Sequence, residues 1–199
     1  MRLVSRGAIG LSSVIGLMGF ANAADLAPSP VVSSPPSAIA LYDPSRFEIR
    51  GGFMAPIEGS EVGTADINGE LVFPKFVSVP GWQDVLIPRL HVGGMGNLSG
   101  RTSYAYAGGL WTVNFDRFFT EAALGGAIHN GPLVTFDSDD PSLGCRALYH
   151  VGANLGYRFD QNWSAMITFD HVSNGRPTLS NCPTNAGLTL LGVRVGYSF

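Results

Sequence analysis

The chain of 199 residues has little charge and no basic tract. Lys, Arg, Asp and Glu make up 14% of the residues, and the 12 basic and 15 acidic side chains give a formal net charge of −3. Binding to nucleic acid needs clustered positive charge, so we expect no nucleic-acid partner. The scattered positions of His91, His129, His150 and His171 match no metal-ligand spacing. We therefore expect neither a metal site nor a cofactor.

Beyond residue 23 the sequence also lacks any run close to the roughly 20 apolar residues that a membrane helix needs. The chain is nevertheless apolar, with a mean hydropathy of +0.19 and 26 glycines. Apolar, Gly-rich, exported chains without such a helix are typical of transmembrane β-barrels, which cross the bilayer with strands. At this stage a soluble periplasmic β-sandwich is the alternative.

The N-terminus has the three parts of a secretory signal peptide. Arg2 and Arg6 form a positive start, residues 8–20 are mostly apolar and too few to span a membrane, and Ala21-Asn22-Ala23 is a small-x-small cleavage site. Cleavage after Ala23 would remove both arginines and leave a net charge of −5. Residues 24–44 are rich in proline, serine and alanine, so we expect a periplasmic lead-in there and a barrel over residues 45–199.

Eight segments have the alternating pattern of β-strands, near residues 46–54, 67–76, 86–96, 102–115, 118–129, 146–159, 162–173 and 187–199. Two connections are tight, at Asp116-Arg117 and Asp160-Gln161, whereas those near 130–145 and 174–186 are long. With the N-terminus in the periplasm, the tight turns lie on the periplasmic side and the long loops lie outside. The sequence therefore predicts an all-β fold, an eight-stranded antiparallel transmembrane β-barrel of the bacterial outer membrane.

Alternation within these strands separates lipid-facing from interior side chains. In the last segment, for example, Leu191, Val193 and Val195 share one face and Arg194 lies on the other. The simplest arrangement is an apolar exterior around an interior of paired charges, too narrow for a pore.

The segment 162–173 ends in a candidate nucleophile and base. His171 and Ser173 lie two residues apart, so they point the same way from a strand, at the end of an apolar stripe on the outer face. Histidine is the usual base that activates a serine hydroxyl. The backbone N–H groups of Asn174 and Gly175, or the Asn174 amide, are placed to form an oxyanion hole. The pair would lie at the level of the outer leaflet, where lipopolysaccharide resides.

These residues carry a resemblance to a known family. The series His171-x-Ser173-Asn174-Gly175, Asn185-x-Gly187 and Leu191-Gly192-Val193-Arg194-Val195-Gly196-Tyr197-Ser198-Phe199 resembles the C-terminal signature of PagL-type lipid A 3-O-deacylases, also called acyloxyacyl-hydrolase-like proteins. The resemblance is concentrated in residues 143–199. It implies a cofactor-independent outer-membrane hydrolase that removes the ester-linked acyl chain at the 3-position of lipid A. His171 would be the general base and Ser173 the nucleophile, with Asn174 and Gly175 supporting the oxyanion.

One position departs from the family pattern. The family's acidic residue, a Glu, aligns with Thr189, which cannot carry a negative charge. Three explanations are open: the acid comes from elsewhere in the chain, a neutral acceptor such as Thr189 or Asn185 orients His171, or the enzyme is weak or inactive. Asp170 adjoins His171 but points inward by alternation, so we do not assign it.

Cys145 and Cys182 are the only cysteines, and both are expected in outer loops. The compartment is oxidising, so we expect a disulfide that ties the loops around the site; two free thiols are the alternative.

The expected partners are lipid A or lipopolysaccharide and the outer membrane, in which the mature chain would be integral. The alternative function is a non-catalytic structural or adhesion barrel of the same fold, which the missing Glu favours. The sequence leaves the acyl-chain preference and the oligomeric state open, a homodimer included.

Overall fold

The computed structural model describes residues 41–136 and 140–199. The signal peptide expected over residues 1–23, and the lead-in up to residue 40, lie outside these ranges. The described residues belong to one compact unit, whose strands close into a barrel. Within the described ranges, no helix is long and apolar enough to cross a membrane.

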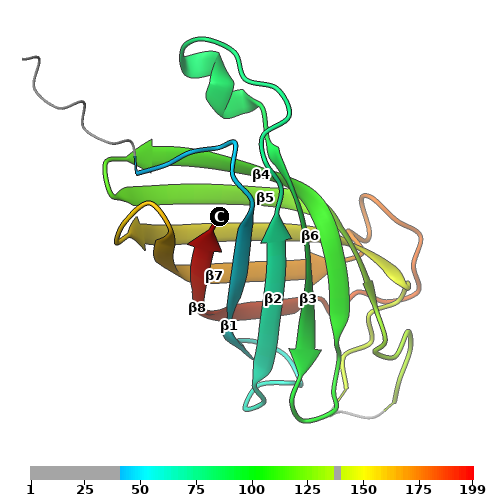
Figure 1. The fold of residues 1–199 in the computed structure, drawn as a ribbon. Coiled ribbons are helices and arrows are strands. Elements are labelled where there is room, and N and C mark those ends of the chain that lie inside the picture. The colour runs from blue at the N-terminus through cyan, green and yellow to red at the C-terminus, as the bar shows by residue number, and fades with distance from the viewer. Residues whose placement is uncertain (1–40, 137–139) are drawn as a thin grey trace, which may run out of the picture. The chain divides into compact units, whose positions relative to one another are not determined.

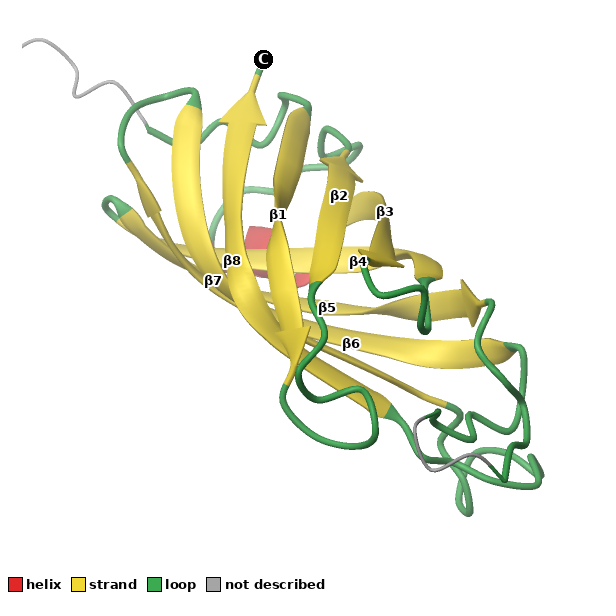
Figure 2. Cartoon of the chain, turned by 90° about the horizontal axis from the view of Figure 1, so that it is seen from below, coloured by secondary structure: helices red, strands yellow, loops and turns green. Residues whose placement is uncertain are grey.

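The barrel is antiparallel and closed, as the sequence predicts (Figure 1). Its strands are β1 (Glu48–Pro56), β2 (Asp66–Val72), β3 (Arg89–Asn97), β4 (Tyr104–Phe115), β5 (Phe118–His129), β6 (Ala147–Arg158), β7 (Trp163–Ser173) and β8 (Leu188–Ser198). Each strand pairs with the next, and β8 pairs back with β1 from Glu48↔Ser198 to Pro56↔Leu190. The second view shows the long strands side by side (Figure 2). Closure leaves no unpaired strand edge, because the first strand meets the last.

The two ends of the barrel differ in their connections. The end that holds the Asp116-Arg117 turn, the 159–162 turn and the C-terminus is called here the turn end. The opposite end, called the loop end, carries the connections 57–65, 98–103, 130–146 and 174–187. The two tight turns that the sequence identified thus lie at one end of the barrel, and the two long loops lie at the other, as expected.

The connection from β2 to β3 is an exception at the turn end. It runs over residues 73–88 and contains a short 3-10 helix, η1 (Trp82–Leu86), which the sequence did not predict. Figure 1 shows this connection standing apart from the barrel wall. Lys75 Nζ binds Asp84 Oδ2 at 2.6 Å, and Trp111 Nε1 donates to the carbonyl of Leu86 at 2.9 Å. The hydrogen bond with Lys75 lowers the pKa of Asp84.

The turn between β6 and β7 is closed by one carboxylate. Asp160 Oδ1 accepts the backbone N–H groups of Trp163 at 2.8 Å and of Asn162 at 2.7 Å. These two bonds lower the pKa of Asp160. A turn residue whose side chain satisfies the backbone explains why so few residues reverse the chain here.

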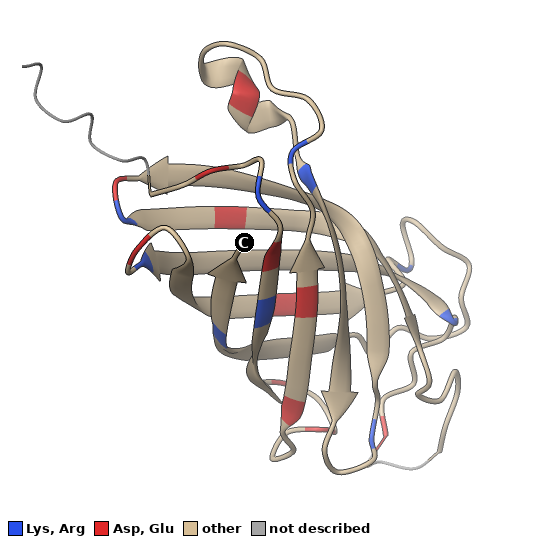
Figure 3. Ribbon diagram, viewed as in Figure 1, with Lys and Arg blue, Asp and Glu red and all other residues tan. Residues whose placement is uncertain are grey.

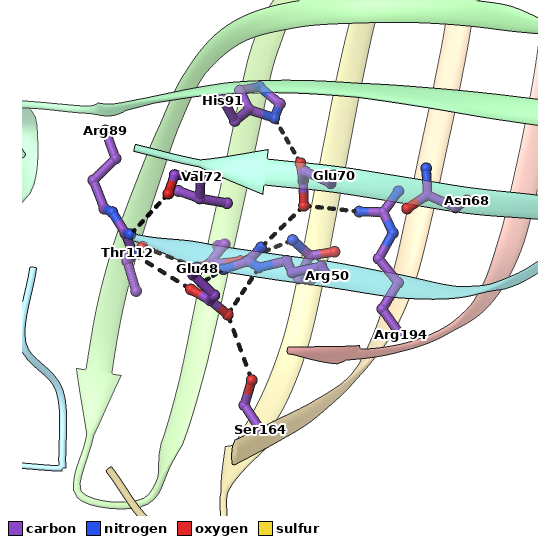
Figure 4. A network of polar contacts seen from close by, with 12 residues as sticks. Glu48, Arg50, Asn68, Glu70, Val72, Arg89, His91, Thr112, Ser164 and Arg194 are labelled. Carbon is purple, nitrogen blue, oxygen red and sulfur yellow. Dashed lines mark hydrogen bonds and ion pairs between the residues drawn. The ribbon is translucent and has the colours of Figure 1, made fainter. Parts of the chain in front are cut away.

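Charged residues lie on several strands of the barrel (Figure 3), and in the interior they form ion pairs (Figure 4). Arg50 binds Glu48 at 2.9 Å, Glu121 at 2.7 Å and Glu70 at 3.4 Å, and none of its side-chain surface is exposed. His91 Nδ1 contacts the same Glu70 at 2.7 Å. Buried charges are tolerated only when they are paired and hydrogen-bonded, which is the case for Arg50. The expectation of an interior made of paired charges is confirmed.

A second cluster continues this network toward the loop end. Asp170 accepts a hydrogen bond from Arg194 Nη2 at 2.5 Å and lies 2.7 Å from His150 Nε2. Arg194 also lies 3.6 Å from Glu70, which joins the two clusters. Asp170 therefore points inward, as alternation predicts, and is engaged away from His171.

Candidate active site

His171 and Ser173 share the outward face of β7 near the loop end. Across the ladders His171 lies opposite Val151 of β6 and Thr189 of β8, and Ser173 lies opposite Tyr149 of β6. Val151 and Tyr149 are 43% and 44% exposed, so the face that holds the pair is turned away from the barrel interior. The two-residue spacing read from the sequence places the candidate base and the candidate nucleophile on this one face.

Gly187, just before β8, lies against both side chains. A Cβ at this position would lie 3.3 Å from His171 Cε1 and 3.8 Å from Ser173 Cβ. Its φ of +67° is in the left-handed region that favours glycine. No hydrogen bond joins Ser173 to His171 among the described residues, so the two side chains converge at Gly187 without being bonded to each other.

The imidazole is held from the other side by a hydroxyl. His171 Nδ1 lies 2.8 Å from Thr189 Oγ1, as expected for residues directly opposite each other on neighbouring strands. The Thr189 hydroxyl in turn donates its proton to Glu58 Oε1. Thr189 is 4% exposed, so this contact is shielded from solvent on its Thr side.

Glu58 is the one site residue that the sequence reading missed. It lies two positions past the end of β1, where the Ile57 N–H donates to the Thr189 carbonyl at 3.0 Å and extends the β1–β8 pairing. Gly59 follows with a φ of +82° and turns the chain. Continued alternation would have put Glu58 on the inward face of Met54 and Pro56, but the chain leaves the strand at this point. The sequence indicated Glu58 only indirectly, because the pairing of β8 with β1 brings the residues that follow β1 next to Thr189.

Asn174 is a structural link between loops. It is 2% exposed, and its Nδ2 donates to the carbonyls of Leu143 at 2.8 Å and of Thr184 at 2.5 Å. Its backbone N–H donates to Asn185 Oδ1 at 3.1 Å. Every N–H donor of Asn174 is therefore engaged. Asn185 contacts Asn174 through this bond, and in the described part of the chain it makes no hydrogen bond with His171.

Gly175 offers the donor that Asn174 does not. Its φ is +73°, and no hydrogen bond of the described residues uses its N–H. A Cβ at Gly175 would lie 3.1 Å from Tyr149 Cε2, so Gly175 lies beside the ring of the residue that is opposite Ser173. Of the two expected oxyanion donors, the geometry leaves the Gly175 N–H available.

The family follows from a sequence match over more than half of the chain. The model of the PagL family, lipid A 3-O-deacylase, matches residues 84–198. The chain belongs to the PagL family. A comparison with curated proteins found no match.

Solved structures share the fold of this PagL-family chain. The crystal structure of the outer membrane enzyme PagL aligns with a TM-score of 0.56 and 18% identity, over 75% of this chain and 97% of that one. A de novo designed transmembrane β-barrel gives 0.51 and 14%, over 79% and 98%. The N-terminal β-barrel domain of Pseudomonas aeruginosa OprF gives 0.50 and 13%, over 78% and 98%. At these identities the similarity shows the barrel fold.

The loops of this PagL-family barrel are tied together beside the site. Cys145 and Cys182 form a disulfide with a Cα–Cα distance of 5.6 Å, which joins the β5–β6 loop to the β7–β8 loop. Thr184 Oγ1 also donates to the carbonyl of Ser142 at 2.8 Å across the same two loops. The expected disulfide is confirmed, and with Asn174 it fixes the segment that carries Gly175 and Gly187.

The outward face below His171 is apolar. Phe169 and Leu191 are directly paired across β7 and β8, followed by Ile167 and Val193, and all four are exposed. Such a stripe is suited to contact an acyl chain. Over residues 41–136 and 140–199, no group of three or more His, Cys, Asp or Glu is arranged to hold a metal ion.

Proposed function

We propose that this chain hydrolyses the ester-linked 3-position acyl chain of lipid A, in the outer leaflet of the bacterial outer membrane. Ser173 is the nucleophile and His171 the general base, on the lipid-facing wall of the barrel. The observation that carries the proposal is the outward-facing His171–Ser173 pair on β7 in a chain of the PagL family. The loop end lies outside the cell, because short turns and the C-terminus of such barrels face the periplasm.

The proposed reaction is a two-step acyl transfer. Ser173 Oγ attacks the ester carbonyl while its proton passes to His171 Nε2, and the Gly175 N–H donates to the resulting oxyanion. The bond between the acyl carbon and the sugar's 3-oxygen then breaks. The imidazolium of His171 gives its proton to that oxygen, which leaves as the 3-hydroxyl group. Water attacks the acyl-serine with His171 again as base, which releases the fatty acid and restores Ser173.

The apolar stripe explains how the substrate would be positioned. An acyl chain lying along Phe169 and Leu191 brings its ester to the level of His171 and Ser173, at the boundary between hydrocarbon and head group. The substrate remains in its leaflet throughout, so binding needs no enclosed pocket. Lipid A and the outer membrane are thus the proposed partners, and no cofactor takes part in the chemistry.

A non-catalytic structural barrel is the second candidate. It is favoured by the threonine at the position of the family's Glu and by the absence of a Ser173–His171 hydrogen bond among the described residues. Catalytic hydrogen bonds often tighten only when substrate is bound, so this geometry alone does not decide between the two.

The deciding experiment is mass spectrometry of lipid A from cells with and without the chain. We expect loss of one 3-position acyl group with the wild type, and at least about a 10³-fold lower rate with Ser173→Ala or His171→Ala. Ser99→Ala, an exposed loop serine away from the site, is the matched control and should behave as wild type. Heat-modifiable migration on gels would verify that each variant forms the barrel. Full activity of Ser173→Ala would remove it as the nucleophile.

A further inference from the structure

We infer that Glu58 is the acid of this site and acts on His171 through the hydroxyl of Thr189. This inference rests on the proposed function, because it assigns a positioning residue to the same base. It resolves the departure at Thr189: the carboxylate comes from the loop after β1, and the β8 threonine connects it to the imidazole.

The hydrogen-bonding capacities of the three groups fix the direction of the chain. An ionised carboxylate can only accept, so the Thr189 O–H is donated to Glu58. A hydroxyl has one proton, so its oxygen must accept the proton of His171 Nδ1 across the 2.8 Å contact. This leaves Nε2 of His171 without a proton, which is the form that a general base needs. The network therefore selects the imidazole tautomer, the task of the acid in a serine hydrolase triad.

Glu58 also supplies charge at the right moment. When Nε2 takes the proton of Ser173, the ring becomes cationic while both Nδ1–H and the Thr189 O–H keep their protons. The negative charge of Glu58 polarises the Thr189 hydroxyl, which makes its oxygen a stronger acceptor for Nδ1–H. Both effects stabilise the cationic ring. No proton moves to Glu58, so its role is orientation and electrostatic support.

The other groups around His171 are committed or uncharged. Val151 faces it from β6, and Asp170, its neighbour on β7, is bound inside the barrel to Arg194 and His150. The second acidic residue of the β1–β2 loop, Glu61, is 1% exposed and accepts the Thr102 N–H at 3.0 Å. Among the described residues, Glu58 is thus the carboxylate connected to the base.

The position of Glu58 is set by backbone pairing. The Ile57 N–H bonds to the carbonyl of Thr189 itself at 3.0 Å, so the residue next to Glu58 and the relay hydroxyl belong to one paired unit. Because these ladder hydrogen bonds already fix the neighbouring backbone, forming the contact requires mainly the ordering of the Glu58 side chain.

A double-mutant cycle on Glu58→Gln and Thr189→Val tests the relay. The rate of Ser173 labelling by a fluorophosphonate probe reports nucleophile activation without lipid A, and lipid A deacylation is measured in parallel. Loss of a directly bound triad acid costs about 10⁴-fold, and an acid acting through a hydroxyl should contribute less, so we expect each single variant to slow both rates about 10- to 100-fold. KM for lipid A should stay within about threefold, because Glu58 does not bind substrate in this mechanism.

The double variant Glu58→Gln/Thr189→Val should be no slower than either single variant, since both break the same chain. Glu58→Gln/Thr189→Glu, which places the carboxylate directly opposite His171, should recover labelling to within about threefold of wild type. A purely structural Glu58 would not be rescued in this way. Asp140→Asn removes a carboxylate from another outer loop, where it binds Arg101, and should match wild type.

Equal labelling rates for wild type and Glu58→Gln would overturn the assignment. The absence of labelling in both proteins would also overturn it. Additive losses in the cycle would do the same. Slower labelling of Glu58→Gln with rescue by Thr189→Glu, in a chain that leaves lipid A unchanged, would keep the relay and refute only the proposed substrate.

Discussion

At the scale of single residues, Arg50 is the cation that three buried carboxylates share. Its guanidinium is the shared partner of Glu48, Glu70 and Glu121 in a part of the barrel closed to solvent. Removing one partner of a buried ion pair leaves an uncompensated charge, which is far costlier than losing an exposed pair.

We therefore expect Arg50→Ala to lower the free energy of unfolding by about 3–5 kcal/mol, because three buried carboxylates then lose the cation that they share. Urea unfolding in lipid vesicles, followed by tryptophan fluorescence, would measure the change. Arg176→Ala, an exposed loop arginine, is the control and should stay within about 0.5 kcal/mol of wild type. A similarly small change for Arg50→Ala would mean that the network is not a source of stability.

The proposed catalytic residues illustrate which residue-level inferences a sequence allows. The positions of His171 and Ser173 follow from strand alternation, which holds over every residue of a regular strand. Glu58 could not be found in this way, because alternation ends with β1 and the direction of the next side chain depends on the loop and on the partner strand. Asn174 is a related case: its hydrogen bonds go to Leu143 in the β5–β6 loop and to Thr184 and Asn185 at the far end of its own loop.

At the scale of elements, the strands were predictable and their connections less so. All eight strands lie within a few residues of the segments read from alternation, since a half-buried sheet imposes that pattern on each strand. The helix η1 has only five residues and no periodicity of its own. Contacts such as Lys75 with Asp84 and Trp111 with Leu86 define it, and these depend on the folded chain.

At the loop end, the connections 130–146 and 174–187 form one cross-linked element. We expect Cys145→Ser/Cys182→Ser to speed proteinase K cleavage within residues 174–187 by about tenfold, because the loop then opens more readily. Heat-modifiable migration should persist, since ladder hydrogen bonds hold the wall independently of the loops. The Ser99→Ala variant serves as the control for cleavage elsewhere. Loss of barrel migration in the double variant would show that the disulfide supports the wall as well.

At the scale of the whole molecule, the barrel is a filled cylinder rather than a channel. The clusters around Arg50 and Arg194 are joined through Glu70 and occupy the interior along much of its length. Small barrels of this strand number leave room for side chains only.

We accordingly expect no single-channel conductance when the purified protein is reconstituted in planar bilayers, with an open porin in the same membrane as the positive control. Stable, reproducible conductance steps would show that the interior is not sealed. Ions can pass only if every layer of interior side chains leaves a path. The prediction therefore concerns the barrel as a whole.

The seam between the first and last strands has a consequence for the timing of activity. The proposed nucleophile and base are both on β7, whereas Glu58 comes from the loop after β1 and reaches Thr189 through the β1–β8 pairing. A nascent chain whose seam is still open would hold a serine and a histidine but no acid. Under the proposed function such a chain would react about 10- to 100-fold more slowly, as expected for Glu58→Gln, and would reach its full rate only on the final closure.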